Sequence, residues 1–340
     1  MPGVGMKHAL FQESREGKKV QCSLCSHRCL ISDGKRGICA VRENRDGVLF
    51  SLVYDRVIAR NVDPIEKKPL FHFLPGSLSY SIAAPGCNFR CLHCQNADIS
   101  QLPRDRGGSI LGDPVTPGQI VASAQAARCA SISYTYTEPT IYFELAYETA
   151  RLAVDAGLKN VFVTNGYITA EALREIRPFL HAANIDLKGF TDDFYRKVCG
   201  AKLQPVLEAI RLYKELGIWI EITTLVIPGH NDSDEELGKI AAFVRSVGED
   251  VPWHVSRFHP TYKLMDKPRT PIETLRRARQ IGLDAGLRYV YEGNIPGEGE
   301  ETMCWSCKKS LVKRIGFAVE ENRVKKGACP YCGAVIEGMW

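Results

Sequence analysis

Three cysteines, Cys87, Cys91 and Cys94, lie close together with the spacing C-x3-C-x2-C. Thiolates are the usual ligands of iron–sulfur clusters, and a cluster with four irons normally takes four cysteines. Three ligands from one loop would leave one iron open to a substrate or cofactor, unless the fold supplies a fourth cysteine. Buried structural thiols are the alternative, but core cysteines rarely cluster so tightly in sequence.

A second group of cysteines consists of two C-x2-C pairs near the C-terminus, Cys304 with Cys307 and Cys329 with Cys332. Paired knuckles of this kind are typical of zinc ribbons. We therefore expect structural zinc. Rubredoxin-like iron is the alternative, because a tetrahedron of four sulfurs suits both metals.

A third group has the spacing C-x2-C-x3-C-x9-C in an N-terminal segment rich in Gly, Lys and Arg: Cys22, Cys25, Cys29 and Cys39. Hydrophobic periodicity is weak around it, so we expect a knuckle whose folding depends on a bound metal. The spacing is compatible with zinc and with a second iron–sulfur cluster.

Between about residues 73 and 300, apolar β-prone runs alternate with helical patterns, which predicts βα units and a parallel sheet covered by helices. The expected strands are 78–84, 131–136, 159–164, 183–188, 218–227, 252–258 and 287–291. Six core strands would form an incomplete (β/α)6 barrel. Pro85 and Gly86 end the first strand, so the loop with Cys87 lies where active sites of parallel α/β proteins gather.

Start signals for helices occur between these strands, as an N-cap residue followed three positions later by Gln or Glu: Thr116 with Gln119, Ser233 with Glu236, and Thr270 with Glu273. Before the first strand, residues 63–76 contain too many prolines for an interior helix or a central strand. We expect an ordered connector there, with Glu66, Lys67 and Lys68 in a solvated turn.

Polar side chains follow three of the expected strands at their carboxyl ends. Glu138 follows the second strand, Thr164 and Asn165 end the third, and Asp186 and Lys188 end the fourth. Such positions favour ligand contacts. Two structural roles remain open, because Glu138 could cap the next helix and Asp186 could form an ion pair with Lys188.

Length and charge limit the remaining possibilities. A chain of 340 residues with 45% hydrophobic residues suits one large α/β domain with small additions. The net charge of +5, from 44 basic and 39 acidic residues, is too small to predict a nucleic-acid or membrane partner. Thirteen cysteines without a signal-peptide pattern or a long apolar run favour a cytoplasmic protein. We expect three parts: 1–72, 73–300 and 301–340.

The cysteine spacing at Cys87, Cys91 and Cys94 resembles the signature of the radical S-adenosylmethionine (SAM) enzymes. The resemblance implies a 4Fe-4S cluster whose open iron chelates SAM, and an electron that cleaves SAM to methionine and a 5'-deoxyadenosyl radical. That radical abstracts hydrogen from a substrate. His93 stands where the superfamily usually has an aromatic residue beside the adenine of SAM.

Other elements resemble the glycyl-radical activases of this superfamily. Glu138 with Pro139 is similar to half of a Gly-Gly-Glu-Pro element that contacts the SAM amino group. Thr164 and Asn165 stand in a Thr-Asn-Gly element near the ribose and methionyl groups, and Asp186 and Lys188 in an Asp-Leu-Lys element. The resemblance implies SAM or substrate contacts for all of them.

Nearly the whole chain resembles the AmmeMemoRadiSam-system radical SAM enzymes, a branch related to pyruvate formate-lyase activating enzymes. This resemblance implies a flavodoxin or ferredoxin as electron donor, and association with Memo-like and AmmeCR-type proteins. We expect a protein residue as the target. The alternatives are the same chemistry on a small molecule or an RNA base, or a non-catalytic scaffold holding iron–sulfur and zinc sites.

Overall fold

The computed structural model describes residues 6–295 and 299–340. Its contacts divide the chain into two compact units. The first unit contains Met1–Asp63, Leu78–His181 and Cys199–Ala201, and the second contains Pro64–Ser77, Ala182–Val198 and Lys202–Trp340. This division follows contacts in space, and the three parts expected from the sequence stay a prediction.

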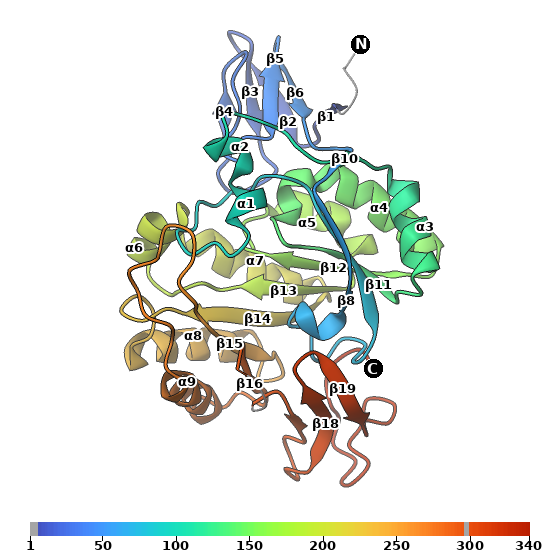
Figure 1. Cartoon of the computed structure of the whole chain (residues 1–340), viewed down its shortest axis with the longest axis vertical. Helices are drawn as coiled ribbons and strands as arrows, with labels where there is room; N and C mark the ends of the chain where they lie inside the picture. Colours follow the sequence, from blue (N-terminus) through green and yellow to red (C-terminus); the bar gives the residue numbers. More distant parts are fainter. Residues whose placement is uncertain (1–5, 296–298) are drawn as a thin grey trace. The chain divides into compact units, whose positions relative to one another are not determined.

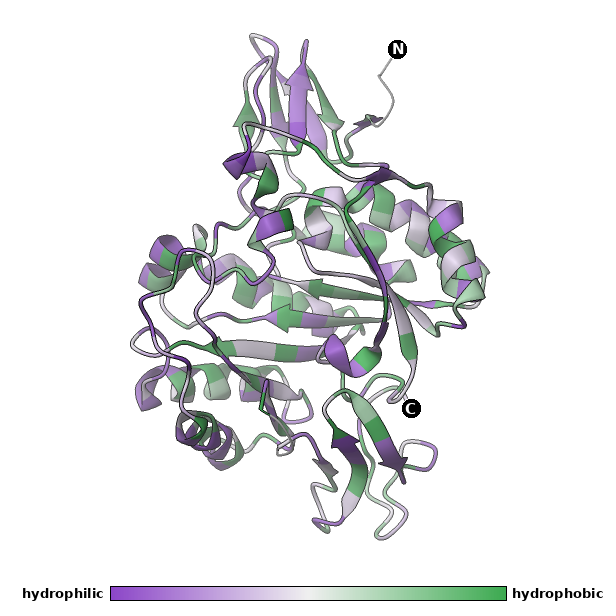
Figure 2. Cartoon of the chain, viewed as in Figure 1, coloured by the Kyte–Doolittle hydropathy of each residue, from purple (hydrophilic) through white to green (hydrophobic). Residues whose placement is uncertain are grey.

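Parallel strands form the centre of the first unit. Strand β11 (Ser131–Tyr134) lies between β9 (Leu78–Ala83) and β12 (Lys159–Thr164) and is parallel to both. Strand β8 (Ala59–Pro64) lies beside β9. Strand β12 has the sequence KNVFVT, and its hydrophobic part is green in Figure 2. The three parallel strands confirm the predicted ones, with ends that differ by up to two residues.

Helices α3 (Pro117–Ala126) and α4 (Phe143–Asp155) pack against each other and against these strands. Thr116 begins α3 with a complete capping box, in which its hydroxyl accepts from the Gln119 backbone and the Gln119 side chain accepts from the Thr116 backbone. This start was predicted and is confirmed.

Two small antiparallel sheets form the N-terminal part of the first unit, which is blue in Figure 1. One sheet has the order β2-β3-β4 and the other β1-β6-β5. The sequence predicted only a knuckle here. Strands of two to four residues are too short and too polar to give a clear alternating pattern.

The second unit continues with its own run of parallel strands: β13 (Ala182–Asp186), β14 (Trp219–Val226), β15 (Trp253–Arg257) and β16 (Val290–Gly293). Helices α7 (Gln204–Glu215), α8 (Asp234–Val247) and α9 (Ile272–Asp284) pack on them or on one another. These strands match the four remaining predicted ones. How many strands join into a partial barrel depends on both units together and stays a prediction.

The start predicted for α9 at Thr270 is wrong, whereas that of α8 at Ser233 is confirmed. Pro271 precedes α9 and provides no side-chain cap. The Thr270 hydroxyl instead accepts from the Phe258 backbone at 2.9 Å and donates to the Val226 carbonyl at 2.7 Å. These two hydrogen bonds to residues distant in sequence therefore take the place of the N-cap hydrogen bond that the sequence predicted.

Three antiparallel strands near the C-terminus, in the order β17-β18-β19, form a ribbon that shares a core with the rest of the second unit. Phe71 of the connector packs there with Tyr289, Tyr291 and Leu311. The predicted solvated turn is wrong, because Glu66 and Lys68 are buried and only Lys67 is exposed. Glu66 accepts from the Gly76 backbone at 2.9 Å and lies 3.8 Å from the Arg314 guanidinium.

A buried carboxylate holds the connector to β14. Glu221 accepts from the backbone of Phe71 at 3.0 Å, the backbone of His72 at 2.8 Å and the ring of His254 at 2.7 Å. Burial acts to raise the pKa of Glu221. The hydrogen bond from the His254 ring and the electrostatic attraction of that ring outweigh burial and hold the pKa of Glu221 below its usual value. The ionised carboxylate is thus a built-in part of the second unit.

The remaining short elements of the first unit are β1 (Lys7–His8), β2 (Gln12–Arg15), β3 (Lys19–Cys22), β4 (Leu30–Ile31), β5 (Arg42–Arg45), β6 (Val48–Ser51), β7 (Arg56–Val57), α1 (Ala97–Ser100), α2 (Leu102–Asp105), β10 (Asp113–Pro114), η2 (Pro139–Tyr142), α5 (Ala170–Ile176) and η3 (Arg177–Phe179). Those of the second unit are η1 (Ile65–Lys67), α6 (Asp192–Phe194), β17 (Thr302–Met303), β18 (Ser310–Ile315) and β19 (Ala318–Asn322). A π-helical turn, η4, spans Tyr195–Cys199.

In residues 6–295 and 299–340, no helix has the length and apolarity needed to cross a bilayer.

We expect Gly338→Ala to destabilise the second unit by roughly 1–3 kcal/mol, because a Cβ at this residue would stand 2.4 Å from the His72 carbonyl oxygen. All four tryptophans of the chain belong to the second unit, so chemical denaturation followed by tryptophan fluorescence measures this loss. Gly238→Ala is the matched control, because a Cβ there meets nothing within 4 Å inside α8. That variant should unfold no earlier than the wild type, and equal loss in both variants would contradict the prediction.

Candidate metal and cofactor site

The loop that carries Cys87, Cys91 and Cys94 follows β9 directly, as predicted. Gly86 has φ +105°, and a Cβ there would lie 2.7 Å from a Val41 methyl group and 3.3 Å from the Cys39 carbonyl oxygen. Only glycine fits such a close approach without a shift of its neighbours. The loop is therefore pressed against the N-terminal segment of the same unit.

The sulfurs of Cys87 and Cys94 have polar neighbours that suit a metal-bound thiolate. The Cys87 sulfur accepts from the Phe89 backbone at 3.3 Å and from the Asn165 side chain at 3.9 Å. The Cys94 sulfur lies 3.1 Å from the Ser100 hydroxyl. The three sulfurs do not form a group within 4.8 Å of one another, so the space among them is larger than one ion needs. This donor set fits an iron–sulfur cluster.

A fourth cysteine, Cys199, lies beside this loop and was not expected from the sequence. Its sulfur, the Cys91 sulfur and a ring nitrogen of His93 all lie within 4.8 Å of one another, and all three residues are buried. The Cys199 carbonyl also accepts from the Arg90 backbone at 2.8 Å. The predicted adenine contact of His93 stays a prediction, and the structure places its ring against these two thiols.

Glu138 is held by hydrogen bonds from four groups. Its carboxylate accepts from the Thr140 backbone at 3.0 Å and hydroxyl at 2.6 Å, from the Thr164 hydroxyl at 2.8 Å and from the Asn165 backbone at 2.8 Å. Burial raises the pKa of Glu138, although these donors act in the opposite direction. Glu138 thus caps η2, the structural role weighed above, and also fixes the end of β12.

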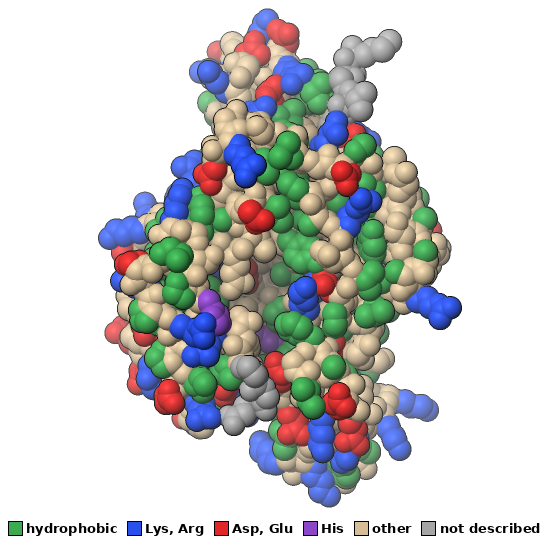
Figure 3. Space-filling view, in the orientation of Figure 1, with side chains coloured by type: hydrophobic (Ala, Val, Ile, Leu, Met, Phe, Trp, Pro, Cys, Tyr) green, Lys and Arg blue, Asp and Glu red, His purple; other side chains and the backbone are tan. Residues whose placement is uncertain are grey.

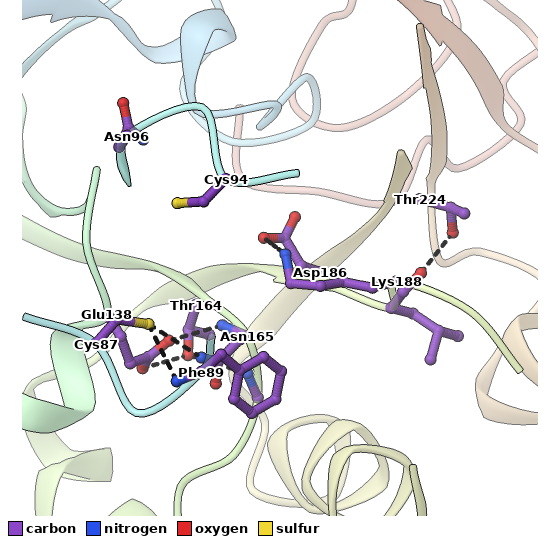
Figure 4. Close-up of polar contacts among 12 residues, drawn as sticks. Cys87, Phe89, Cys94, Asn96, Glu138, Thr164, Asn165, Asp186, Lys188 and Thr224 are labelled. Atoms are coloured by element: carbon purple, nitrogen blue, oxygen red, sulfur yellow. Dashed lines mark hydrogen bonds and ion pairs between the residues drawn. The ribbon is translucent and has the colours of Figure 1, made fainter. Parts of the chain in front are cut away.

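Asn165 links Glu138 to the cysteine loop, as Figure 4 shows. Its side-chain nitrogen donates to the Asn88 side-chain oxygen at 2.8 Å and approaches the Cys87 sulfur, while its oxygen accepts from the Tyr167 backbone at 3.0 Å. Burial raises the pKa of the Cys87 thiol, and the nearby Glu138 adds to that rise. The structure therefore brings Cys87, Glu138, Thr164 and Asn165 into one hydrogen-bonded set.

Asp186 and Lys188 belong to the second unit. Strand β13 ends at Asp186, and the Lys188 ammonium lies 2.8 Å from its carboxylate, with both side chains partly exposed. The Lys188 backbone donates to the Tyr195 hydroxyl at 3.1 Å, and its carbonyl accepts from the Asn231 side chain at 2.7 Å. The ion pair weighed above is thus present. Its predicted contact with SAM or substrate stays a prediction.

The four C-terminal thiols converge on one point. The sulfurs of Cys304, Cys307, Cys329 and Cys332 all lie within 4.8 Å of one another, with contacts of 3.6 and 3.7 Å between opposite pairs. The backbone N–H of Ala334 lowers the pKa of Cys332 to about 7. The ribbon therefore holds a site of the size of one metal ion.

Charges on this ribbon alternate in sign. Glu321 of β19 lies 2.5 Å from the Arg323 guanidinium and 3.9 Å from the Lys313 ammonium. Figure 3 shows red and blue side chains intermixed on this face. This face therefore lacks the uninterrupted basic surface that nucleic-acid binding would favour.

We expect Cys199→Ser to leave the iron content and the electron paramagnetic resonance (EPR) spectrum of the reduced protein without SAM unchanged. The Cys199 sulfur lies closer to Cys91 than a cluster of four irons would separate two of its ligands. If Cys199 is the fourth ligand in the absence of SAM, the variant spectrum will differ from the wild type before SAM is added.

Comparisons with known proteins agree with this geometry. Residues 81–241 match the family model described as the radical SAM superfamily. An uncharacterised protein of Methanocaldococcus jannaschii is 48% identical over 98% of this chain and 99% of its own. Pyruvate formate-lyase 1-activating enzyme of Escherichia coli K12 is 22% identical over 61% of this chain and 89% of its own. A radical SAM methyltransferase from Sphaerobacter thermophilus shares the fold with a TM-score of 0.51, at 18% identity over 65% of this chain and 67% of its own.

Proposed function

Because the chain belongs to the radical SAM superfamily, we propose that Cys87, Cys91 and Cys94 hold a 4Fe-4S cluster that cleaves SAM to start hydrogen abstraction from a protein residue. When bound, the cluster supplies one electron to SAM, which gives methionine and a 5'-deoxyadenosyl radical. The observation that carries this proposal is the hydrogen-bonded set that joins the cysteine loop to the ends of β11 and β12.

The residues of this set have separate roles. N–H groups directed at the Cys87 sulfur from Phe89 and Asn165 stabilise its thiolate form. The Glu138 carboxylate orients Thr164 and Asn165 by accepting hydrogen bonds from the Thr164 hydroxyl and the Asn165 backbone. We assign Thr164, Asn165 and Glu138 to the methionyl and ribose side of SAM, His93 to its adenine side, and Asp186 with Lys188 to SAM or substrate.

The relative named as a pyruvate formate-lyase activating enzyme supports a protein target. A flavodoxin or ferredoxin is the proposed electron donor, and Memo-like and AmmeCR-type proteins are proposed partners. In the ribbon we propose zinc. Tetrahedral ligands at about 2.3 Å from zinc stand about 3.8 Å apart, close to the 3.6 and 3.7 Å contacts of the ribbon sulfurs.

The test uses anaerobically purified, iron-reconstituted protein. EPR spectra of the dithionite-reduced protein are recorded with and without SAM, and 5'-deoxyadenosine is measured by chromatography. A SAM-dependent spectral change with release of 5'-deoxyadenosine is the expected result. If protein fully loaded with iron shows neither the spectral change nor 5'-deoxyadenosine, the proposal fails and the non-catalytic scaffold is the remaining alternative.

A further inference from the structure

The N-terminal thiols surround a cavity of their own. Cys22, Cys25, Cys29 and Cys39 line it together with Arg42 and apolar side chains that include Ile141. Cys22 and Cys39 are buried. Apolar walls around thiolates exclude water and are a usual surrounding of iron–sulfur sites.

The spacing of these sulfurs differs from that of the ribbon sulfurs. The four ribbon sulfurs meet within 4.8 Å, as a single ion requires. The N-terminal thiols, all of them in the described chain, form no such group of three or four, although all four border one cavity. A cluster of four irons places metal atoms between its ligands and so needs this wider arrangement.

The guanidinium of a buried Arg42–Glu144 ion pair lines this cavity. Arg42 is 2% exposed, and its Nη2 donates to Glu144 at 2.5 Å and to the Leu10 carbonyl at 2.8 Å. Its Nε and Nη1 are buried and have no hydrogen-bond partner among the described residues. Buried N–H donors without partners are costly. A cluster with four thiolates and bridging sulfides is an anion that would accept from them.

We propose that Cys22, Cys25, Cys29 and Cys39 hold a second iron–sulfur cluster, with Nε and Nη1 of Arg42 as hydrogen-bond donors to it. The proposal concerns a site separate from the SAM-cleaving one and does not depend on SAM chemistry. Zinc, the alternative left open by the spacing of these cysteines in sequence, would draw the sulfurs together as in the ribbon.

The test uses the full chain with all three signature cysteines changed to alanine, Cys87→Ala, Cys91→Ala and Cys94→Ala. Iron, acid-labile sulfide and zinc are measured after anaerobic reconstitution, together with the EPR spectrum after dithionite reduction. We expect about four irons and about four sulfides per chain and an iron–sulfur EPR signal. Iron bound in the ribbon would bring no sulfide, so sulfide separates the two sites.

The proposal is overturned if the triple variant binds no labile sulfide, whether it gains a second zinc or stays without metal. Far-ultraviolet circular dichroism of the whole chain is the folding control, because all four tryptophans belong to the second unit and do not report on the first unit, which carries these cysteines. Adding Cys22→Ser and Cys25→Ser to the triple variant should then remove the remaining sulfide, whereas adding Cys129→Ser should not. Failure of SAM cleavage in the wild type would leave this test unaffected.

Discussion

Cys91→Ala is expected to abolish release of 5'-deoxyadenosine, with a loss of at least about a thousand-fold. Changes to groups that only support a metal ligand typically cost 10- to 100-fold, and loss of a ligand costs more. Cys91 is buried in the signature loop, so no solvent molecule easily replaces its thiolate. The measurement is chromatography of the products after anaerobic reduction in the presence of SAM.

Cys129→Ala is the matched control. Cys129 is also buried, but its sulfur has only a distant 4.0 Å contact to the Ala127 carbonyl and lies in no group of metal-ligand atoms among the described residues. This variant should cleave SAM at the wild-type rate. SAM cleavage retained by Cys91→Ala would refute the assignment of the signature thiols.

The second unit is expected to lose roughly 3 kcal/mol of its unfolding free energy between pH 6.5 and pH 4. Burial lowers the pKa of His72 from 6.5 to about 4. In the neutral ring, Nδ1 donates to the Glu337 carbonyl at 2.7 Å and Nε2 accepts from the Tyr291 hydroxyl at 2.7 Å. Protonation removes that acceptor and places a positive ring near the Arg314 guanidinium.

The sign follows from linkage. The unfolded chain takes up a proton near pH 6.5 and the folded chain only near pH 4, so stability is fully present above pH 6.5 and falls as the pH drops towards 4. Denaturation curves at several pH values, followed by tryptophan fluorescence, measure the slope. In His72→Phe, which carries the same metal-binding cysteines, the slope should be smaller. An unchanged slope would contradict the role of His72.

Local patterns in the sequence predicted the parallel strands and two of the three helix starts, but not the short N-terminal strands. The strand before Cys87 was predicted because an apolar β-prone run ends at Pro85 and Gly86, and the start of α3 because Thr116 and Gln119 satisfy each other's backbone. Such signals depend on neighbours a few residues away. The start predicted at Thr270 failed because its hydroxyl bonds instead to the backbone of Val226, at the end of β14, and of Phe258, which follows β15.

The candidate site could be predicted only in part. The three signature cysteines carry their own spacing, but Cys199 comes to the loop from far along the chain and has no local motif. Likewise the sequence suggests that Glu138 lies near a ligand, yet not that four donors already occupy its carboxylate. The position of Cys199 and the donors to Glu138 both depend on contacts between residues far apart in sequence, which spacing in the sequence does not predict.

Arg104 joins the two cysteine segments of the first unit. Its guanidinium donates to the carbonyl of Ile38, the neighbour of Cys39, at 2.5 Å, and to the carbonyls of Cys87 and Phe89, each at 2.7 Å. One side chain thus fixes the backbone at both thiol sites. If the N-terminal cysteines hold the proposed cluster, its loading and the ordering of the signature loop should therefore be coupled, because Arg104 contacts the backbone of both segments.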